Sequence, residues 1–237
     1  MSASEQARSF HRVADAYERG RPGWPPEVLD LLPVADEATV LDVGAGTGKL
    51  TRVLAARYAR VLALEPLAEL RAILEERVPK AEALPGVAEA IPLDEGSVDA
   101  VFTGQAFHWF ANAVAVGEIA RVLRPGGVLA RLWNEAIDPY PLPDEYRLRL
   151  QELHDAMRPP PIPGDVFEGT PFGDMHEGSV DHEQRSSRDE VLAFAASVSW
   201  IANRGDRDAV LAELASLLPE GEYTFQMRTY FEWATRD

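Results

Sequence analysis

The sequence predicts an α/β fold in which a mostly parallel sheet carries helices on both faces. Two observations predict it. Short apolar runs alternate with helix-like segments through the first 134 residues, and the first run leads directly into a glycine-rich loop. Such alternation is typical of parallel sheets built from strand–helix–strand units. The length of 237 residues suits one domain with a sizeable core.

The parallel part is predicted to contain four strands, which are the apolar runs Thr39–Val43, Val61–Leu64, Val98–Phe102 and Val128–Trp133. Helical apolar spacing follows the first two runs, over Leu50–Arg57 and Leu67–Arg77, and returns over Ala111–Leu123. We expect a turn at Arg124–Gly127, because a proline and paired glycines interrupt regular structure.

The composition changes after Glu135, where prolines crowd the chain as far as Pro171. This segment is therefore predicted to form no continuous core element. A short helix that begins near Pro143 is expected within it, with one apolar face formed by Tyr146, Leu150, Leu153 and Met157. We interpret the segment as an excursion that covers a pocket, with a plain linker as the alternative.

The C-terminal third is predicted to form two helices and a long strand. Ser187 and Glu190 form a capping box before an apolar helix that reaches about Ile201. A second helix over Val210–Leu218 ends at a proline. Apolar and polar residues then alternate over Tyr223–Trp233, which indicates a half-buried strand that can close the sheet as an antiparallel member.

Composition excludes several classes of function. Thirty-nine acidic residues against 23 basic ones give a net charge of −16, which repels nucleic acid and anionic membrane surfaces. The chain has no cysteine, which excludes disulfides, thiolate nucleophiles and cysteine-ligated metals. The first residues show no apolar core of a secretory signal, and the longest uncharged run is interrupted by polar residues. We therefore expect a soluble, cytoplasmic protein.

The glycine loop at Val43–Gly48 is the strongest local signal for a ligand. Glycines allow a sharp turn and let a ligand approach the main chain closely. A nucleoside-triphosphate loop is excluded, because it requires glycine at position 43 and serine or threonine where Leu50 stands. A dinucleotide fingerprint counted from Gly44 requires its third glycine at Lys49, which disfavours NAD without excluding it.

The remaining ligand class is an adenosyl group without phosphates. Glu65 stands at the carboxyl end of the second predicted strand, 21 positions after Gly44. A carboxylate at that place can accept hydrogen bonds from both ribose hydroxyls, and such charged hydrogen bonds contribute about 1.5–3 kcal/mol each.

Six stretches of the chain match one family in order, over about residues 10–134. They are the opening segment Phe10–Pro25, the loop sequence VLDVGAGTGKLT, Leu64–Pro66, Ala88–Asp99, Gln105–Phe110 and Arg121–Gly127. On these stretches the chain resembles the class I S-adenosylmethionine-dependent methyltransferases, and in particular their trans-aconitate-methyltransferase-like branch. The resemblance implies a doubly wound, Rossmann-like sheet of seven strands, of which the last is antiparallel. It also implies S-adenosyl-L-methionine as cofactor and S-adenosyl-L-homocysteine as product.

The resemblance further implies a single methyltransferase domain with four parts. These are N-terminal lid helices in residues 1–30, a cofactor-binding core in 38–134, an insertion over the acceptor pocket in 135–172, and the completion of the sheet in 173–237.

The implied cofactor site draws on several segments of the chain. Its members are Tyr17 and Arg21, which close over the cofactor; Asp42, which supports the loop or reaches the ammonium through water; Gly44, Ala45 and Gly46 along the methionine tail; Glu65 and Pro66 at the ribose; Ala88 and Glu89 at the adenine; and Gln105 near the sulfonium. Arg21 is expected to pair with the cofactor carboxylate. Many relatives carry an acidic residue where this chain has Val87, which places the usual contact to the adenine amino group in question.

Methyl transfer from a cationic sulfur is an in-line displacement, in which good positioning alone supplies about 7–11 kcal/mol. We expect no metal: His176 and His182 on one predicted strand would lie about 20 Å apart and could not share an ion. His108 is the candidate general base, with helix capping or pocket shaping as the alternative. Trp109, Trp133 and Trp200 are candidates for the wall of an acceptor site, with core packing as the alternative.

The predicted acceptor is a small molecule. A carboxylate acceptor needs no base but should meet an arginine, whereas a phenol or an amine requires His108. Arg21 and Arg131 do not decide between these acceptors. Two alternatives to a methyltransferase stay open from the residues themselves: a non-catalytic S-adenosylmethionine-binding protein and a nicotinamide-dependent oxidoreductase.

Overall fold

The structure, a computed structural model, describes residues 14–155 and 166–237. Its internal contacts divide the chain into two units. Among the described residues, the sheet unit comprises 23–135, 166–181 and 228–237, and the helical unit comprises 14–22, 136–155 and 182–227. The four-part division predicted from the resemblance stays a prediction.

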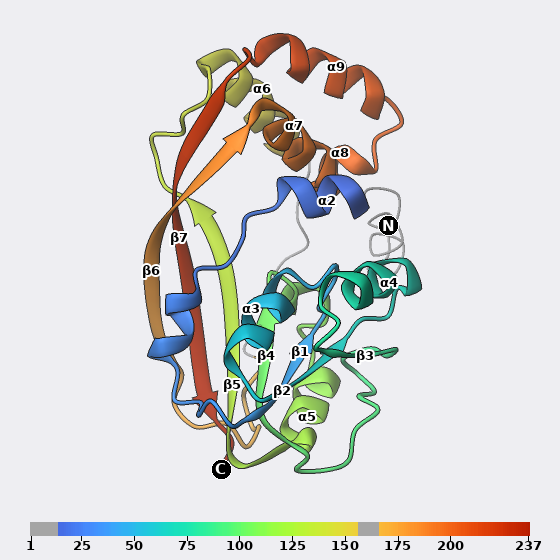
Figure 1. Cartoon of the computed structure of the whole chain (residues 1–237), viewed down its shortest axis with the longest axis vertical. Coiled ribbons are helices and arrows are strands. Elements are labelled where there is room, and N and C mark those ends of the chain that lie inside the picture. Colours follow the sequence, from blue (N-terminus) through green and yellow to red (C-terminus); the bar gives the residue numbers. More distant parts are fainter. Residues whose placement is uncertain (1–13, 156–165) are drawn as a thin grey trace. The chain divides into compact units, whose positions relative to one another are not determined.

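The described chain forms the following elements, and Figure 1 labels its α-helices and strands. They are α2 (Ala14–Gly20), η2 (Pro26–Leu31), β1 (Thr39–Val43), α3 (Lys49–Arg57), β2 (Arg60–Leu64), α4 (Ala68–Arg77), β3 (Glu82–Leu84), β4 (Val98–Gly104), η3 (Phe107–Trp109), α5 (Ala113–Val122), β5 (Leu123–Ala136), α6 (Asp144–Asp155), β6 (His176–Ser187), α7 (Arg188–Ser197), α8 (Ser199–Ala202), α9 (Arg207–Leu217) and β7 (Glu222–Thr235). The four strands and three helices predicted for the parallel part are confirmed as β1, β2, β4, β5, α3, α4 and α5. Strand β3 was missed because three residues carry no measurable periodicity.

Seven strands pair in the order β3-β2-β1-β4-β5-β7-β6. The pairs β1–β2, β1–β4, β2–β3 and β4–β5 are parallel. Strand β7 runs antiparallel to β5, since the Gly126 N–H donates to the Arg236 carbonyl and the Ile137 N–H to the Gln226 carbonyl, each at 2.7 Å. The predicted α/β fold with seven strands and an antiparallel last strand is confirmed.

The turn predicted at Arg124–Gly127 falls within strand β5, as an irregularity of its ladder with β4. Helix α5 ends at Val122 and strand β5 begins at the next residue. Val98 pairs with Leu123 and Ala100 with Val128, so residues 124–127 bulge out of the ladder while remaining within the strand. Pro125 offers no N–H to a ladder, and Gly126 has a φ of +76°, which suits a bulge. Proline and glycine therefore interrupt the pairing of β5 with β4.

The core of the sheet unit has two layers, one on each face of the sheet. Successive residues of β1, such as Val40 and Leu41, point to opposite faces and enter different apolar clusters. Helix α3 and η2 contribute Leu54 and Val28 to one cluster, and α5 contributes Ile119 to the other. This arrangement is the doubly wound packing expected of a parallel sheet.

The helical unit has its own core, formed by α6 to α9 together with part of β7. The predicted face of α6 is confirmed for Tyr146 and Leu153, which are buried, whereas Met157 lies outside the described residues. Helix α2 packs closely on α7, because a Cβ at Gly20 would lie 2.1 Å from the Phe194 nitrogen. The packing leaves no room for any residue but glycine there.

The capping box of Ser187 and Glu190 is confirmed at the start of α7. The predicted single helix as far as Ile201 is divided, however, into α7 and α8 at Val198, which has extended backbone angles. The Ser197 carbonyl accepts a hydrogen bond from Arg21, and this contact satisfies a carbonyl at the end of α7.

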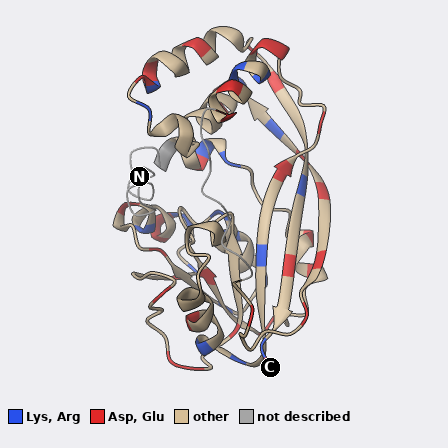
Figure 2. Cartoon of the chain, turned by 180° about the vertical axis from the view of Figure 1, so that it is seen from behind, with Lys and Arg blue, Asp and Glu red and all other residues tan. Residues whose placement is uncertain are grey.

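In the part of the chain that the structure describes, acidic residues occur on several helices and strands, as Figure 2 shows, rather than in one element. In residues 14–155 and 166–237, no helix is both long and apolar enough to cross a membrane.

Candidate cofactor and acceptor site

The glycine loop follows β1 and turns sharply into α3. Gly44, Gly46 and Gly48 have φ values of +74°, +58° and +86°, which side-chain-bearing residues rarely adopt. A Cβ at Gly44 would also lie 2.7 Å from the Cβ of Ala106. The Gly44 and Ala45 N–H groups both donate to the Leu64 carbonyl, at 2.9 and 3.1 Å. The loop is thus held against the end of β2.

The Glu65 carboxylate fixes the loop from the end of β2. Its Oε2 accepts from the Gly46 N–H and its Oε1 from the Leu67 N–H, each at 2.9 Å. Burial raises the pKa of Glu65, while these two N–H groups act in the opposite direction. A carboxylate has about four lone-pair sites, so both oxygens keep acceptor capacity. The ribose contact of Glu65 stays a prediction, and its support of the loop is an additional role.

Asp42 is buried at the end of β1, with 1% of its surface exposed. The Thr51 hydroxyl of α3 donates to its Oδ2 at 2.6 Å. Its Oδ1 is buried and has no hydrogen-bond partner among the described residues. Burial raises the pKa of Asp42 to about 7, and the nearby Glu65 acts in the same direction. One oxygen thus supports the loop, and the other is available to a cationic or hydroxyl group.

Gln105 follows β4 in an unusual conformation, with a φ of +55°. Strained residues of this kind occur often at functional sites. Its Nε2 donates to the Asn134 carbonyl at the end of β5, at 2.9 Å. The Asn134 Nδ2 in turn donates to the Gly23 carbonyl at 2.9 Å, and the buried Thr229 hydroxyl donates to the Asn134 Oδ1. Asn134 therefore joins β4, β5, β7 and residue 23.

Sequence reasoning missed Asn134 and Thr229. The one available signal for Asn134 was its place directly after the predicted strand that ends at Trp133. Thr229 shows no such signal, because it stands in an alternating strand and gains its partner from a residue 95 positions away.

The segment predicted at the adenine follows β3. Ala88 is buried, and the Glu89 Oε1 accepts from the Asn112 Nδ2 at 2.9 Å. Val87 is exposed and pairs across a short bridge with Ala90. The carboxylate of Glu89 is thus oriented by the start of α5.

The candidate acceptor residues of the sheet unit lie on η3 and β5. His108 is exposed, and its ring centroid lies 4.6 Å from that of Trp109. Trp109 packs on an apolar cluster of the core, whereas Trp133 stacks on Tyr230 at 5.6 Å. The Arg131 guanidinium lies 4.7 and 4.8 Å from the ring centroids of Phe107 and Phe167, which stack on each other, and it pairs with Glu232. The acceptor roles of these residues stay predictions.

Tyr17, Arg21 and Trp200 belong to the helical unit. The Arg21 Nε donates to the Ser197 hydroxyl at 3.1 Å, and its guanidinium lies 5.3 Å from the Tyr17 ring centroid. Burial lowers the pKa of Arg21. Trp200 packs on the core of the helical unit and lies edge-on to His154. These contacts lie within one unit, so the predicted closure of Tyr17 and Arg21 over a cofactor stays a prediction.

The residues at the loop fit the adenosyl ligand predicted above. The buried Asp42 Oδ1, which has no partner among the described residues, suits an ammonium, and the Glu65 carboxylate suits ribose hydroxyls. Within the described ranges, no group of three or more histidine or acidic residues could hold a metal ion.

Comparisons with known proteins agree with this assignment. A family profile described as "Methyltransferase domain" matches residues 41–130. The chain is 31% identical over 235 residues to an uncharacterised methyltransferase of Schizosaccharomyces pombe, covering 93% of this chain and 92% of that protein. It is 50% identical over 133 residues to an uncharacterised methyltransferase of Mycobacterium tuberculosis; this match covers 56% of the chain and only about half, 55%, of the relative.

Solved structures share the fold. A protein from Anaeromyxobacter dehalogenans described as a type II methyltransferase gives a TM-score of 0.66 at 23% identity, covering 91% of this chain and 97% of the other. The geranyl diphosphate C-methyltransferase of Streptomyces coelicolor, solved with S-adenosyl-L-homocysteine, gives 0.50 at 16% identity, covering 90% and 78%. The trans-aconitate-methyltransferase-like branch stays a prediction. The glycine loop, the sheet order and these matches together show that the chain belongs to the class I S-adenosylmethionine-dependent methyltransferases, with S-adenosyl-L-methionine as its cofactor.

Proposed function

We propose that this protein transfers the methyl group of S-adenosyl-L-methionine to an oxygen or nitrogen atom of a small molecule, with carboxylates among the candidate acceptors. The observation that carries the proposal is the pair of buried carboxylates at the glycine loop. Glu65 is fixed by two N–H groups, and one oxygen of the buried Asp42 has no hydrogen-bond partner among the described residues.

The bound cofactor supplies a methyl group on a cationic sulfur. The chain's own residues have to hold donor and acceptor in line and exclude water, which can supply about 7–11 kcal/mol of the barrier. For this alignment we propose Gln105, which directly follows β4. Its side chain is bound to the Asn134 carbonyl and its N–H to the Leu132 carbonyl, and these two contacts hold it in its unusual conformation. No metal takes part in the proposed reaction.

His108 is the proposed proton acceptor for a phenol or an amine. It is exposed on η3, three residues after Gln105, so a substrate can reach its ring. A carboxylate acceptor is already ionised at neutral pH and needs no base. The variant His108→Ala therefore separates the acceptor classes: we expect the loss of phenol or amine methylation and the retention of carboxylate methylation.

A small acceptor agrees with the charge of the chain. A net charge of −16 repels nucleic acid at long range. The structurally similar enzyme of Streptomyces coelicolor is named for a small molecule, geranyl diphosphate. Efficient methylation of bulk RNA by this protein would contradict the proposal.

The first test is thermal stabilisation by S-adenosyl-L-homocysteine, S-adenosyl-L-methionine and NAD, measured side by side. A ligand at 100 times its dissociation constant adds about 2.7 kcal/mol to stability. We expect stabilisation by the two sulfur ligands and a much smaller effect in Glu65→Ala. Unchanged affinity in this variant would overturn the ribose assignment, and stabilisation by NAD alone would overturn the cofactor.

The second test is methyl transfer from labelled S-adenosyl-L-methionine to panels of carboxylic acids, phenols and amines. Turnover with one panel supports the proposal and identifies the acceptor class. Normal cofactor affinity without turnover in any panel would favour a non-catalytic binding protein instead.

A further inference from the structure

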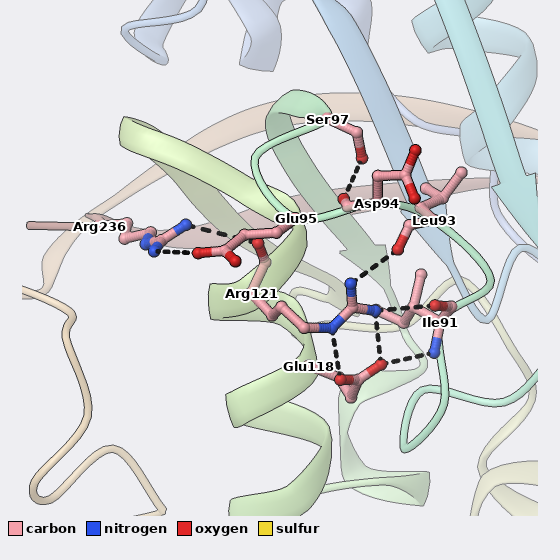
Figure 3. Close-up of polar contacts among 8 residues, drawn as sticks. All are labelled: Ile91, Leu93, Asp94, Glu95, Ser97, Glu118, Arg121 and Arg236. Carbon is pink, nitrogen blue, oxygen red and sulfur yellow. Dashed lines mark hydrogen bonds and ion pairs between the residues drawn. The ribbon is translucent and has the colours of Figure 1, made fainter.

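Two charged side chains of α5 hold the loop that follows the predicted adenine segment. Arg121 donates from Nη1 to the Leu93 carbonyl at 2.7 Å and from Nη2 to the Ile91 carbonyl at 2.9 Å. Its Nε and Nη2 also donate to the two oxygens of Glu118, at 2.7 and 2.8 Å. Figure 3 shows this arrangement, in which one guanidinium contacts two carbonyls and one carboxylate.

Both backbone polar groups of Ile91 are hydrogen-bonded to side chains of α5. Its N–H donates to the Glu118 Oε2 at 2.9 Å, while its carbonyl accepts from Arg121. The pairing of Arg121 with Glu118 lowers the pKa of the Glu118 carboxyl, so Glu118 is ionised at neutral pH. Hydrogen bonds to charged groups are stronger than neutral ones and fix geometry more tightly.

Asn112, at the start of α5, makes a second contact to the same segment. The Asn112 Oδ1 caps α5 by accepting from the Val114 and Ala115 N–H groups, at 3.1 and 3.0 Å. The Asn112 Nδ2 donates at the same time to the Glu89 carboxylate at 2.9 Å. Both ends of the segment Glu89–Ile91 are therefore bound to one rigid helix.

A third set of contacts holds α5 itself. The Gly96 N–H donates to the Arg121 carbonyl at 2.9 Å, and Arg236 of the C-terminal segment donates to the Leu123 carbonyl while its guanidinium lies 3.8 Å from Glu95. The loop after the segment and the end of β7 therefore meet at the C-terminal end of α5, as Figure 3 shows.

We propose that Arg121, Glu118 and Asn112 are positioning residues for the adenine side of the cofactor site: α5 holds residues 87–91 in the shape that receives the base. None of the three contacts the cofactor in this account. Their hydrogen bonds end on the main chain of Ile91 and Leu93 and on the side chain of Glu89. The proposal rests on the assignment of Ala88 and Glu89 to the adenine.

The variant Arg121→Gln removes the donors to the two carbonyls and should weaken S-adenosyl-L-homocysteine binding by about tenfold. The matched control is Arg60→Gln, which removes an exposed arginine of similar type that pairs with Glu82. This control should change the affinity by less than about twofold, because exposed ion pairs contribute little. Both affinities are measured by calorimetry on the full chain.

Two further readouts separate positioning from a loss of stability. The first is the ratio of affinities for S-adenosyl-L-homocysteine and S-inosyl-L-homocysteine, which differ at the adenine amino group. If residues 87–91 lose their position, this ratio of affinities falls. If the protein is only less stable, the ratio stays the same. The second is hydrogen exchange of residues 86–97, which should become faster in Arg121→Gln while exchange in β1 and β4 stays unchanged.

Asn112→Asp is the second variant, for use if Arg121→Gln does not fold. Aspartate keeps the capping oxygen of α5, but it removes the amide donor and places a second carboxylate at Glu89. We expect weaker binding and a lower ratio here as well. Wild-type affinity and ratio in either folded variant would overturn the proposal.

A separate experiment tests the assignment of Ala88 and Glu89 to the adenine. In the wild-type protein, S-adenosyl-L-homocysteine should slow hydrogen exchange in residues 86–93. Binding without such protection would overturn the assignment, and the positioning role with it, while leaving the proposed methyl transfer intact.

Discussion

Replacement of Asp42 by asparagine tests how the buried carboxylate at the glycine loop affects stability. The pKa of Asp42 is raised from 3.8 to about 7 in the folded protein because the group is buried. Between these values the folded state holds a proton that the unfolded state has lost, so the free energy of unfolding falls as pH rises. The slope is about 1.4 kcal/mol per pH unit, which amounts to a loss on the order of 4 kcal/mol by neutral pH.

The asparagine side chain of the variant can still accept the Thr51 hydroxyl, but it carries no charge at any pH. We therefore expect Asp42→Asn to be more stable than the wild type at about pH 8 and similar to it at about pH 4. The assay is urea denaturation of both proteins across this range, with the difference between them as the measured quantity. Other titrating groups are common to both proteins and cancel. A difference that stays constant between about pH 5 and pH 8 would refute the reasoning.

The same variant separates the two roles predicted for Asp42. If Oδ1 reaches the ammonium of the cofactor, the ionised form is favoured on binding, and the affinity of the wild type for S-adenosyl-L-homocysteine should rise from about pH 6 to about pH 8. Asp42→Asn should then bind more weakly and lose this dependence. Equal affinity in both proteins at every pH would leave Asp42 only its support of the loop through Thr51.

Three other substitutions test the packing around the site. Asn134→Ala removes the hydrogen bonds of the Asn134 side chain with the buried Thr229 hydroxyl and the Gly23 carbonyl, and it should lower the free energy of urea unfolding by about 1–3 kcal/mol; an unchanged value would show that these contacts contribute nothing. Gly44→Ala combines a φ of +74° with a Cβ only 2.7 Å from the Cβ of Ala106. We expect this variant to be destabilised by about 1–3 kcal/mol and to lose cofactor binding, as measured by calorimetry. A variant that binds the cofactor tightly would contradict this expectation. Tyr146→Phe removes a buried hydroxyl that has no partner among the described residues and should be neutral or stabilising by up to about 1 kcal/mol in the same unfolding assay; clear destabilisation would point to a partner for the hydroxyl.

The local features of this protein could be predicted from its sequence. Strand β1 has the predicted bounds, and the capping box of Ser187 and Glu190 is formed as expected. Both features depend on residues that are neighbours in the chain: apolar runs indicate strands, and a cap is formed within four residues. The glycine loop at Gly44 was predictable for the same reason, since its backbone conformation is a property of the glycines themselves.

The tertiary structure alone decided which side chains meet. The Thr229 hydroxyl reaches Asn134 across 95 positions, and Arg121 reaches the Ile91 carbonyl across 30. Nothing in the periodicity of either segment indicates its partner, because hydrogen bonds of this kind depend on the order and register of strands. The outcome at Arg124–Gly127 has the same cause: proline and glycine indicate interrupted pairing, but only the neighbouring strand determines whether the chain turns or bulges. The sequence thus determined the elements and the cofactor loop, and strand pairing determined how the residues around that loop are held.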